Sequence, residues 1–213
     1  MPRKVKLILN PMADMGNAWR VADDLRPIVA EYGLADWSGT VYPTHATELA
    51  KQAALDGYDM VVAMGGDGTV HEVVNGLMQV PEEKRPILGV VPLGSGNDFA
   101  HSVGIPDKAD HALAHALKGE PSTIDLGLLT DEQGRKEYFD NTLGIGFDAV
   151  VTIRSHTLPI LKGFLMYLVA VIQTILLNHN AAKMQIETDT KKWEQDVLML
   201  TLCNGPREGG GFM

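Results

Sequence analysis

The sequence has 213 residues and one cysteine, Cys203, so it cannot form an internal disulfide. A single cysteine is typical of a reducing compartment, and we expect Cys203 to be a buried strand residue. The sequence also lacks a basic excess, because its formal net charge is −9. Duplex nucleic acid is bound largely through Lys and Arg that neutralise phosphates, so this charge argues against a nucleic-acid partner.

No uncharged hydrophobic run reaches the roughly 18 to 20 residues that a transmembrane helix needs. The only candidate, residues 158–177, is interrupted by Lys162 and Gln173. We expect a helix there whose apolar face either packs in the core or borders a lipid pocket or the bilayer surface. The first apolar run stops at Asn10-Pro11, which fits a strand and not a signal peptide. These features favour a cytoplasmic protein without a transmembrane segment.

The composition, 45% hydrophobic and 21% charged, is typical of a folded protein. In the first part of the chain, apolar strands alternate with helical patterns, which predicts a parallel sheet covered by helices on both faces. The expected strands are 5–9, 39–42, 60–64 and 87–91, and the expected helices are 18–32, 47–55, 69–78 and one after residue 97. Thr47 is a candidate cap for the second helix.

The pattern changes near Thr123. Residues 124–129 and 138–142 are strand-like and are joined across a turn-rich stretch, 131–134, which predicts a hairpin. Two further strands, 183–188 and 197–203, are also separated by a polar turn. The second part is therefore expected to be antiparallel, with a boundary between residues 123 and 130.

A glycine-rich loop, Gly65-Gly66-Asp67-Gly68-Thr69, connects an expected buried strand to a helix. Glycines let backbone N–H groups approach an anion, and the helix N-terminus favours negative charge. Asp67 would repel phosphates unless a divalent cation lay between them, so it is a candidate metal-positioning residue. The alternative is a turn aspartate that bonds its own backbone. Thr69 and Glu72 have capping-box spacing, which indicates a structural role first.

A second loop, Gly94-Ser95-Gly96-Asn97-Asp98, repeats the arrangement, with Asn97 as a plausible helix cap. Two such loops at the carboxyl ends of parallel strands can face one crevice, where open α/β sheets bind ligands. His111 and His115 have a metal-compatible spacing on a helix, but no third ligand accompanies them, so a solvated helix face is favoured.

Several segments resemble the diacylglycerol kinase catalytic-domain family, which includes bacterial soluble lipid kinases and sphingosine kinases. The resemblance runs along nearly the whole chain in the family's order. The segments are Gly65 to Leu77, Pro92 to Ala100, Ile124-Asp125-Leu126-Gly127, Asn141 to Asp148, and Asn204-Gly205 through Phe212.

The resemblance implies an α/β fold, with a Rossmann-like ATP-binding domain over residues 1–125 and a partial antiparallel β-sandwich lipid-substrate domain over residues 126–213. It implies an ATP- and Mg²⁺-dependent kinase that transfers the γ-phosphate to a lipid hydroxyl, such as that of diacylglycerol, at the inner face of the membrane. Together with the loops, it implies that the nucleotide is bound by Asn10, Thr44, Gly65, Gly66, Asp67, Gly68, Thr69, Glu72, Gly94, Ser95 and Asn97. Asp67, Asp98 and Asp125 would form the magnesium network, partly through water. A homodimer is left open.

Two departures from the family pattern matter. The first loop, residues 10–16, lacks the family's Ser-Gly pair and contains Asp14 instead. The family's Asp-Gly-x-Leu-Asp segment, expected to supply the general base, would follow Met213, so we expect a fragment without its catalytic base. Two alternatives remain: an NAD kinase, which shares the Gly-Gly-Asp-Gly loop but should carry an Asn-Glu motif not found here, and a non-catalytic nucleotide-binding fragment.

Overall fold

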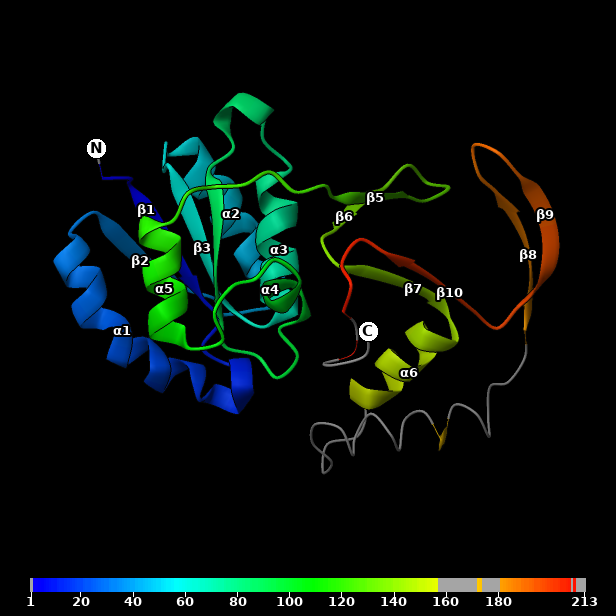
Figure 1. The fold of residues 1–213 in the computed structure, drawn as a ribbon, viewed down its shortest axis with the longest axis horizontal. Helices are drawn as coiled ribbons and strands as arrows, with labels where there is room; N and C mark the ends of the chain where they lie inside the picture. The colour runs from blue at the N-terminus through cyan, green and yellow to red at the C-terminus, as the bar shows by residue number, and fades with distance from the viewer. Residues whose placement is uncertain (1, 157–171, 174–180, 208, 210–213) are drawn as a thin grey trace. The chain divides into compact units, whose positions relative to one another are not determined.

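The computed structural model describes residues 2–156, 172–173, 181–207 and 209 (Figure 1). They form two compact units, one of residues 1–141 with 204–213 and the other of residues 142–203. The domain boundary predicted from the sequence falls earlier, at residues 125–126. The intervening hairpin belongs to the first unit because it packs on a helix of that unit.

The first unit is built on a four-stranded parallel sheet with the order β2-β1-β3-β4. Its strands are β1 (Val5–Leu9), β2 (Ala35–Gly39), β3 (Met60–Gly65) and β4 (Ile87–Pro92). In the register of this sheet, Leu7 of β1 is paired with Trp37 of β2 on one side and with Val62 of β3 on the other. All residues of β3 are buried, as expected for a central strand covered on both faces.

Helices cover both faces of this sheet (Figure 1). They are α1 (Ala18–Tyr32), α2 (His45–Leu55), α3 (Asp67–Leu77), α4 (Asp98–Ser102) and α5 (Ala109–Lys118), with short 3-10 turns at η1 (Ala13–Gly16) and η2 (Glu82–Lys84). Successive strand side chains point to opposite faces. Leu7 and Leu9 therefore pack with α1 and α5, whereas Ile8 packs with α2, α3 and α4. The predicted parallel sheet between helical layers is confirmed.

The rest of the described chain is mainly antiparallel. In the first unit, β5 (Gly127–Thr130) and β6 (Lys136–Phe139) form the expected hairpin. In the second unit, β7 (Thr142–Gly146) pairs with β10 (Met199–Cys203), and β8 (Ala182–Glu187) pairs with β9 (Lys192–Val197). Helix α6 (Phe147–His156) follows β7.

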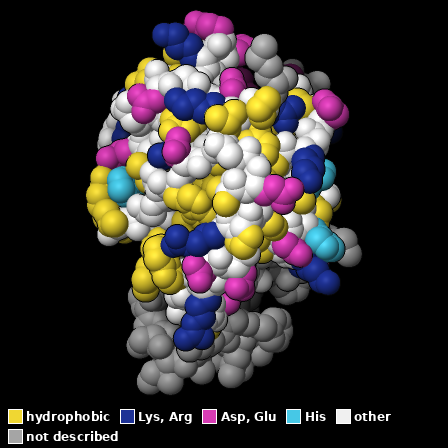
Figure 2. Space-filling view, turned by 90° about the vertical axis from the view of Figure 1, so that its left-hand side faces the viewer, with side chains coloured by type: hydrophobic (Ala, Val, Ile, Leu, Met, Phe, Trp, Pro, Cys, Tyr) yellow, Lys and Arg dark blue, Asp and Glu magenta, His cyan; other side chains and the backbone are white. Residues whose placement is uncertain are grey.

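The apolar segment 158–177 lies almost entirely outside the described residues. Among the helices that are described, none is long and apolar enough to cross a bilayer. Figure 2 shows the face on the side of α1 and β2, where acidic and basic side chains are interspersed and no basic stripe is formed.

Some predicted boundaries and roles were wrong. The second strand spans residues 35–39 instead of 39–42, because its pairing with β1 ends at Gly39. The second helix begins at His45, so Thr47 lies inside it and does not cap it. The Thr47 hydroxyl instead donates a hydrogen bond to the Glu72 carbonyl. Two predicted strands, 138–142 and 197–203, are each divided between two strands of the structure. Cys203 ends a strand but is exposed.

The packing of α2 on α3 requires a glycine at position 76. A Cβ there would collide with the Thr47 carbonyl oxygen and lie 2.9 Å from the Ala50 Cβ. We expect Gly76→Ala to lower the free energy of unfolding by about 1 to 3 kcal/mol through overpacking. Urea unfolding measures this effect.

Gly68→Ala is the matched control on the same helix, because a Cβ at Gly68 meets no atom within 4 Å. Since alanine is the better helix residue, we expect stability there to stay constant or rise by up to about 1 kcal/mol. Equal destabilisation by both substitutions would contradict the packing explanation.

Candidate functional site

The two glycine-rich loops meet at the carboxyl ends of β3 and β4. The strands are paired in register up to Gly65 and Pro92, so the loops that follow leave the sheet side by side. A Cβ on Gly66 would lie 3.1 Å from the Gly94 Cα, and a Cβ on Gly94 would collide with the Gly66 backbone. Only glycines allow this approach, which brings the two loops into one surface.

Asn97 holds the second loop in shape. Its side-chain oxygen accepts a hydrogen bond from the Gly94 amide at 2.9 Å, and its side-chain nitrogen donates to the Gly94 carbonyl at 2.8 Å. Asn97 occupies the N-cap position of α4, but it makes no side-chain cap bond and has a positive φ of 54°. The predicted helix cap is therefore a loop brace.

Thr69 and Glu72 do not form the predicted capping box. Because α3 begins at Asp67, Thr69 lies inside the helix, buried, and its hydroxyl accepts a hydrogen bond from the Asn10 side chain at 3.2 Å. Glu72 serves the neighbouring helix instead. Its carboxylate accepts hydrogen bonds from the backbone amides of Thr44 and Ala46, at 3.0 and 3.1 Å. It thus gives a partner to amides at the start of α2, where a helix has no internal acceptors for them.

A cavity of about 380 Å³ lies at this surface. The predicted nucleotide-binding residues that line it are Asn10, Gly66, Asp67, Gly68, Thr69, Glu72, Gly94 and Ser95. The other three lie beside it. Gly65 ends β3, Asn97 braces the loop, and Thr44 is held by Glu72.

A second cavity, of about 390 Å³, shares Asn10, Thr69 and Glu72 with the first. Its remaining wall is mainly apolar and comes from the segments that follow β1 and β2. That wall consists of Met12, Thr40, Val41, Tyr42, Pro43 and Ala46. Met12 and Val41 are among the most exposed large apolar residues of the described chain. Exposed apolar surface of this kind marks ligand-binding grooves.

The carboxylate of Asp67 is half-buried in the wall of the first cavity and accepts a hydrogen bond from the Phe99 amide at 3.1 Å. Burial raises its pKa above 3.8, backbone hydrogen bonds oppose this shift, and the Asp98 carboxylate raises the pKa further. A buried carboxylate beside a second carboxylate is destabilised in its charged form. A cation would relieve both effects.

The three aspartates of the predicted magnesium network lie in different surroundings. Asp98 is buried and forms an ion pair with Arg207 at 3.2 Å. Asp125 is exposed, and its backbone carbonyl accepts a hydrogen bond from the Asn204 side chain. No three His, Cys, Asp or Glu residues in the described part of the chain are close enough to hold a metal ion. A cation here would rely on Asp67 together with groups of the ligand, as Mg²⁺ commonly does.

Sequence reasoning missed two residues, Arg207 and Asp140. Arg207 reaches Asp98, and Asp140 is buried directly after β6. Neither has a local sequence signal. Asp14, which the sequence showed only as a departure within the first loop, lines the cavity, with a φ of 47° that Asp tolerates better than most residues. His111 and His115 are exposed on α5, as expected for a solvated helix face.

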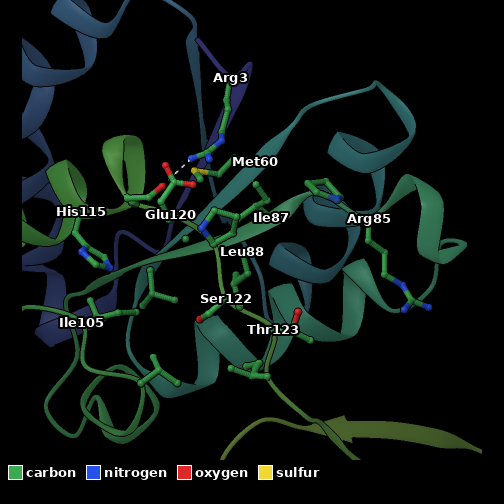
Figure 3. A pocket seen from close by; sticks show the side chains of 18 of the residues that line it. Arg3, Met60, Arg85, Ile87, Leu88, Ile105, His115, Glu120, Ser122 and Thr123 are labelled. Atoms are coloured by element: carbon green, nitrogen blue, oxygen red, sulfur yellow. Dashed lines mark hydrogen bonds between the residues drawn. The ribbon is translucent and has the colours of Figure 1, made fainter. Parts of the chain in front are cut away.

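A larger cavity, of about 530 Å³, lies elsewhere, along β4 and the start of the sheet (Figure 3). Arg3, Met60 and Glu120 gather at one end of it, and the Arg3 guanidinium donates to the Gly119 carbonyl at 3.2 Å. It shares no wall residue with the glycine loops. Open α/β sheets bind ligands beyond the carboxyl ends of their strands, so we place the functional site at the smaller cavities.

Comparisons with known proteins find relatives of this chain. A family model described as the diacylglycerol kinase catalytic domain matches residues 4–129. The chain is 37% identical over 166 residues to "Probable lipid kinase YegS-like" of Chromohalobacter salexigens, covering 76% of this chain and 51% of that protein. It is 35% identical over 167 residues to the protein of the same name from Yersinia enterocolitica, covering 78% and 55%. The chain thus spans about half the length of these curated relatives.

A solved diacylglycerol kinase structure from Bacillus anthracis is similar in fold, with a TM-score of 0.74 and 25% sequence identity. That match covers 100% of this chain and 68% of the solved chain.

The raised pKa of Asp67 predicts how stability depends on pH. The folded state keeps the Asp67 proton to a higher pH than the unfolded chain. The contribution of Asp67 to the free energy of unfolding is therefore fully present below the ordinary Asp pKa, and it is lost as the pH rises through the raised pKa. Asp67→Asn, which keeps an acceptor for the Phe99 amide, should remove this loss. In urea unfolding between about pH 4 and pH 7, the variant should gain stability relative to the wild type as the pH rises; a relative loss would contradict the assignment.

Proposed function

The chain belongs to the diacylglycerol kinase catalytic-domain family, and on that premise we propose that it binds a magnesium-complexed nucleoside triphosphate for phosphoryl transfer to a lipid hydroxyl. One observation carries this proposal: two glycine loops in backbone contact form a cavity with a half-buried carboxylate in its wall.

The phosphates would lie in the cavity between the glycine loops. Exposed backbone there can approach an anion closely, and α3, which is 11 residues long, directs its N-terminus to the same place. Asn10 and Thr69 add side-chain donors to the cavity wall. The conversion of Ser-Gly to Ala13-Asp14 removes one hydroxyl from the first loop and adds a negative charge.

A divalent cation fits the donor set. Asp14, Asp67 and Glu72 are the titratable groups in the phosphate cavity, and all three are acidic. A triphosphate could not enter such a wall without neutralisation of charge, and Asp67, a half-buried carboxylate, is the group best suited to share a cation with phosphates. When bound, the cation would neutralise charge on the transferring phosphoryl group.

The nucleoside would occupy the adjoining apolar cavity. Tyr42 stacks on His45 with ring centroids 4.4 Å apart, and its hydroxyl donates to Glu48 at 2.8 Å, so the ring is held in place. Met12 and Val41 offer apolar surface beside it. Glu72 borders both cavities and fixes the segment between them through the Thr44 amide.

In the proposed reaction, the lipid hydroxyl oxygen forms a bond to the γ-phosphorus, and the bond from that phosphorus to the bridging oxygen breaks. The nucleoside diphosphate leaves, and the hydroxyl proton passes to a general base. The residues described here would position the donor and exclude water from it. The action at a membrane surface, the lipid substrate and the cytoplasmic location remain part of this proposal.

Radiolabelled ATP tests the substrate class. The chain is incubated with Mg²⁺, ATP and mixed micelles that contain diacylglycerol, and in a parallel reaction with NAD. Label in the lipid phase would support the proposal. Label in NADP would overturn it in favour of an NAD kinase, and binding without transfer to any acceptor would restrict this chain to nucleotide binding.

Asp67→Asn tests the cation role. Calorimetry measures ATP affinity with excess Mg²⁺ and with a chelator, and the ratio of the two dissociation constants is the magnesium-linked gain. We expect the variant to lose at least about 10-fold of this gain, equivalent to about 1.4 kcal/mol, because the carboxylate that shares the cation is gone.

Asp24→Asn, an exposed substitution on α1 with the same change in net charge, should keep the gain. An unchanged gain in Asp67→Asn would refute the metal role.

A further inference from the structure

His45, the first residue of α2, supports the wall of the apolar cavity that adjoins the phosphate cavity. It does not line that cavity itself, but Val41 and Tyr42, which do, both contact its ring. The Val41 amide lies 3.2 Å from the His45 Nδ1 atom, and the Tyr42 ring stacks on the imidazole with an interplanar angle of 22°. One half-buried imidazole thus holds two residues of the cavity wall.

Residues 41–45 form a turn that His45 closes twice. Its backbone amide donates to the Tyr42 carbonyl at 3.3 Å, and its ring accepts from the Val41 amide. The turn is strained at Thr44, whose φ of 71° is costly for a β-branched residue. Val41 is 78% exposed, so packing does little to hold it. This part of the wall therefore depends on a few specific contacts, and the bond from Val41 to the imidazole is one of them.

The bond to Val41 determines the protonation state of the ring. A backbone N–H can only donate, so the Nδ1 atom of His45 must accept and cannot carry a proton. The proton of the neutral imidazole is then on Nε2. When the ring gains a second proton, Nδ1 becomes a donor that faces another donor, and this hydrogen bond is lost. Support of the wall therefore requires a neutral histidine.

Charges of both signs act on the imidazole from the surrounding elements. On α2, the Glu48 carboxylate accepts a hydrogen bond from the Tyr42 hydroxyl at 2.8 Å. From α3, the Glu72 carboxylate accepts hydrogen bonds from the two amides that flank His45 in the sequence. Both carboxylates favour a protonated ring, whereas the N-terminus of α2 opposes a positive charge at its first residue. Because these effects oppose each other, the lost hydrogen bond is the main consequence of protonation for the cavity wall.

We propose that His45 is a positioning residue for nucleotide binding: its neutral ring holds Val41 and Tyr42 in the geometry that accepts the nucleoside, and its protonation loosens that wall. This role rests on the proposed function, in which the nucleoside occupies the apolar cavity. It adds a residue that does not line the phosphate cavity. Nucleotide affinity should accordingly decrease as the pH falls through the range in which histidine changes charge, between about pH 8 and pH 5.

Two substitutions separate the hydrogen bond from the stacking. His45→Asn keeps a side-chain acceptor for the Val41 amide and cannot be protonated, whereas His45→Phe keeps a flat ring beside Tyr42 and has no acceptor. Calorimetry measures the dissociation constant of ATP in excess Mg²⁺ for each chain from about pH 8 to about pH 5.5. At each pH, the wild-type constant is divided by the constant of the variant, which cancels the titration of ATP itself.

We expect the ratio of wild type to His45→Asn to rise about 3- to 10-fold as the pH falls over this range, because only the wild type loses the bond to Val41. At about pH 8, His45→Asn should bind ATP within about 3-fold of the wild type, whereas His45→Phe should bind about 3- to 10-fold more weakly. At the acidic end, the wild type should approach the affinity of His45→Phe. Thermal unfolding at each pH checks that every chain is folded.

His111→Asn is the matched control. It makes the same substitution on α5 of the same unit, at a side chain that is 64% exposed. The dissociation constant of this variant should follow the wild-type pH dependence, so that its ratio to the wild type stays constant.

Three results would overturn the role of His45. They are a ratio of wild type to His45→Asn that stays constant with pH, wild-type affinity in His45→Phe at about pH 8, and an equal rise in the ratio of wild type to His111→Asn. If His45→Phe does not fold, the His45→Asn ratio alone decides. If the wild type binds no ATP at any pH, the proposed function fails and this role with it, whereas ATP binding with a constant His45→Asn ratio removes this role alone.

Discussion

The backbone contact between Gly66 and Gly94 is the constraint on which the rest of the site depends. It exists because β3 and β4 are neighbours in a parallel sheet, and their pairing runs in register to the last residue of each strand. The loops then have no room for a side chain between them. Two parts of the phosphate cavity's wall are positioned relative to this contact: the start of α3 and, through the side-chain brace of Asn97, the second loop. A site built from backbone tolerates little movement, and the buried strands supply the rigidity that it needs.

The second organising feature is an excess of buried negative charge. Asp67, Asp98 and Asp140 come from three separate segments, and only Asp98 has a cationic partner, Arg207, among the ion pairs of the described residues. In the absence of ligand, the other two carboxylates reduce stability, since burial makes their charged forms unfavourable. Folding alone would favour neutral residues there. For Asp67, which lines the phosphate cavity, the arrangement is reasonable in a protein whose ligand carries a compensating cation, because the binding free energy then includes relief of this cost.

The sequence predicted those parts of the molecule that depend on local pattern. Apolar periodicity placed the buried strands and α1, and the glycine-rich loops indicated the cavity that they form. It failed where a side chain serves a distant segment. Glu72 has the spacing of a partner for Thr69, yet it satisfies the amides at the start of α2, because the close packing of α2 on α3 brings those amides within reach. Asp140 and Arg207 gave no signal for the same reason: their significance comes from what the fold places next to them.

Backbone strain gives independent support for the position of the site. In the described part of the chain, the non-glycine residues with positive φ are Asp14, Met15, Thr44 and Asn97. Asp14 lines the phosphate cavity, and the other three belong to segments that contribute neighbouring residues to the walls of the two adjoining cavities. Each such residue costs roughly 1 kcal/mol or more and persists only when its surroundings hold it. Asn97 is held through Gly94, and Thr44 is held through Glu72. The strain is explained if the loops must present their backbone and the Asp14 carboxylate to a ligand in one fixed geometry, as a phosphate-binding surface requires.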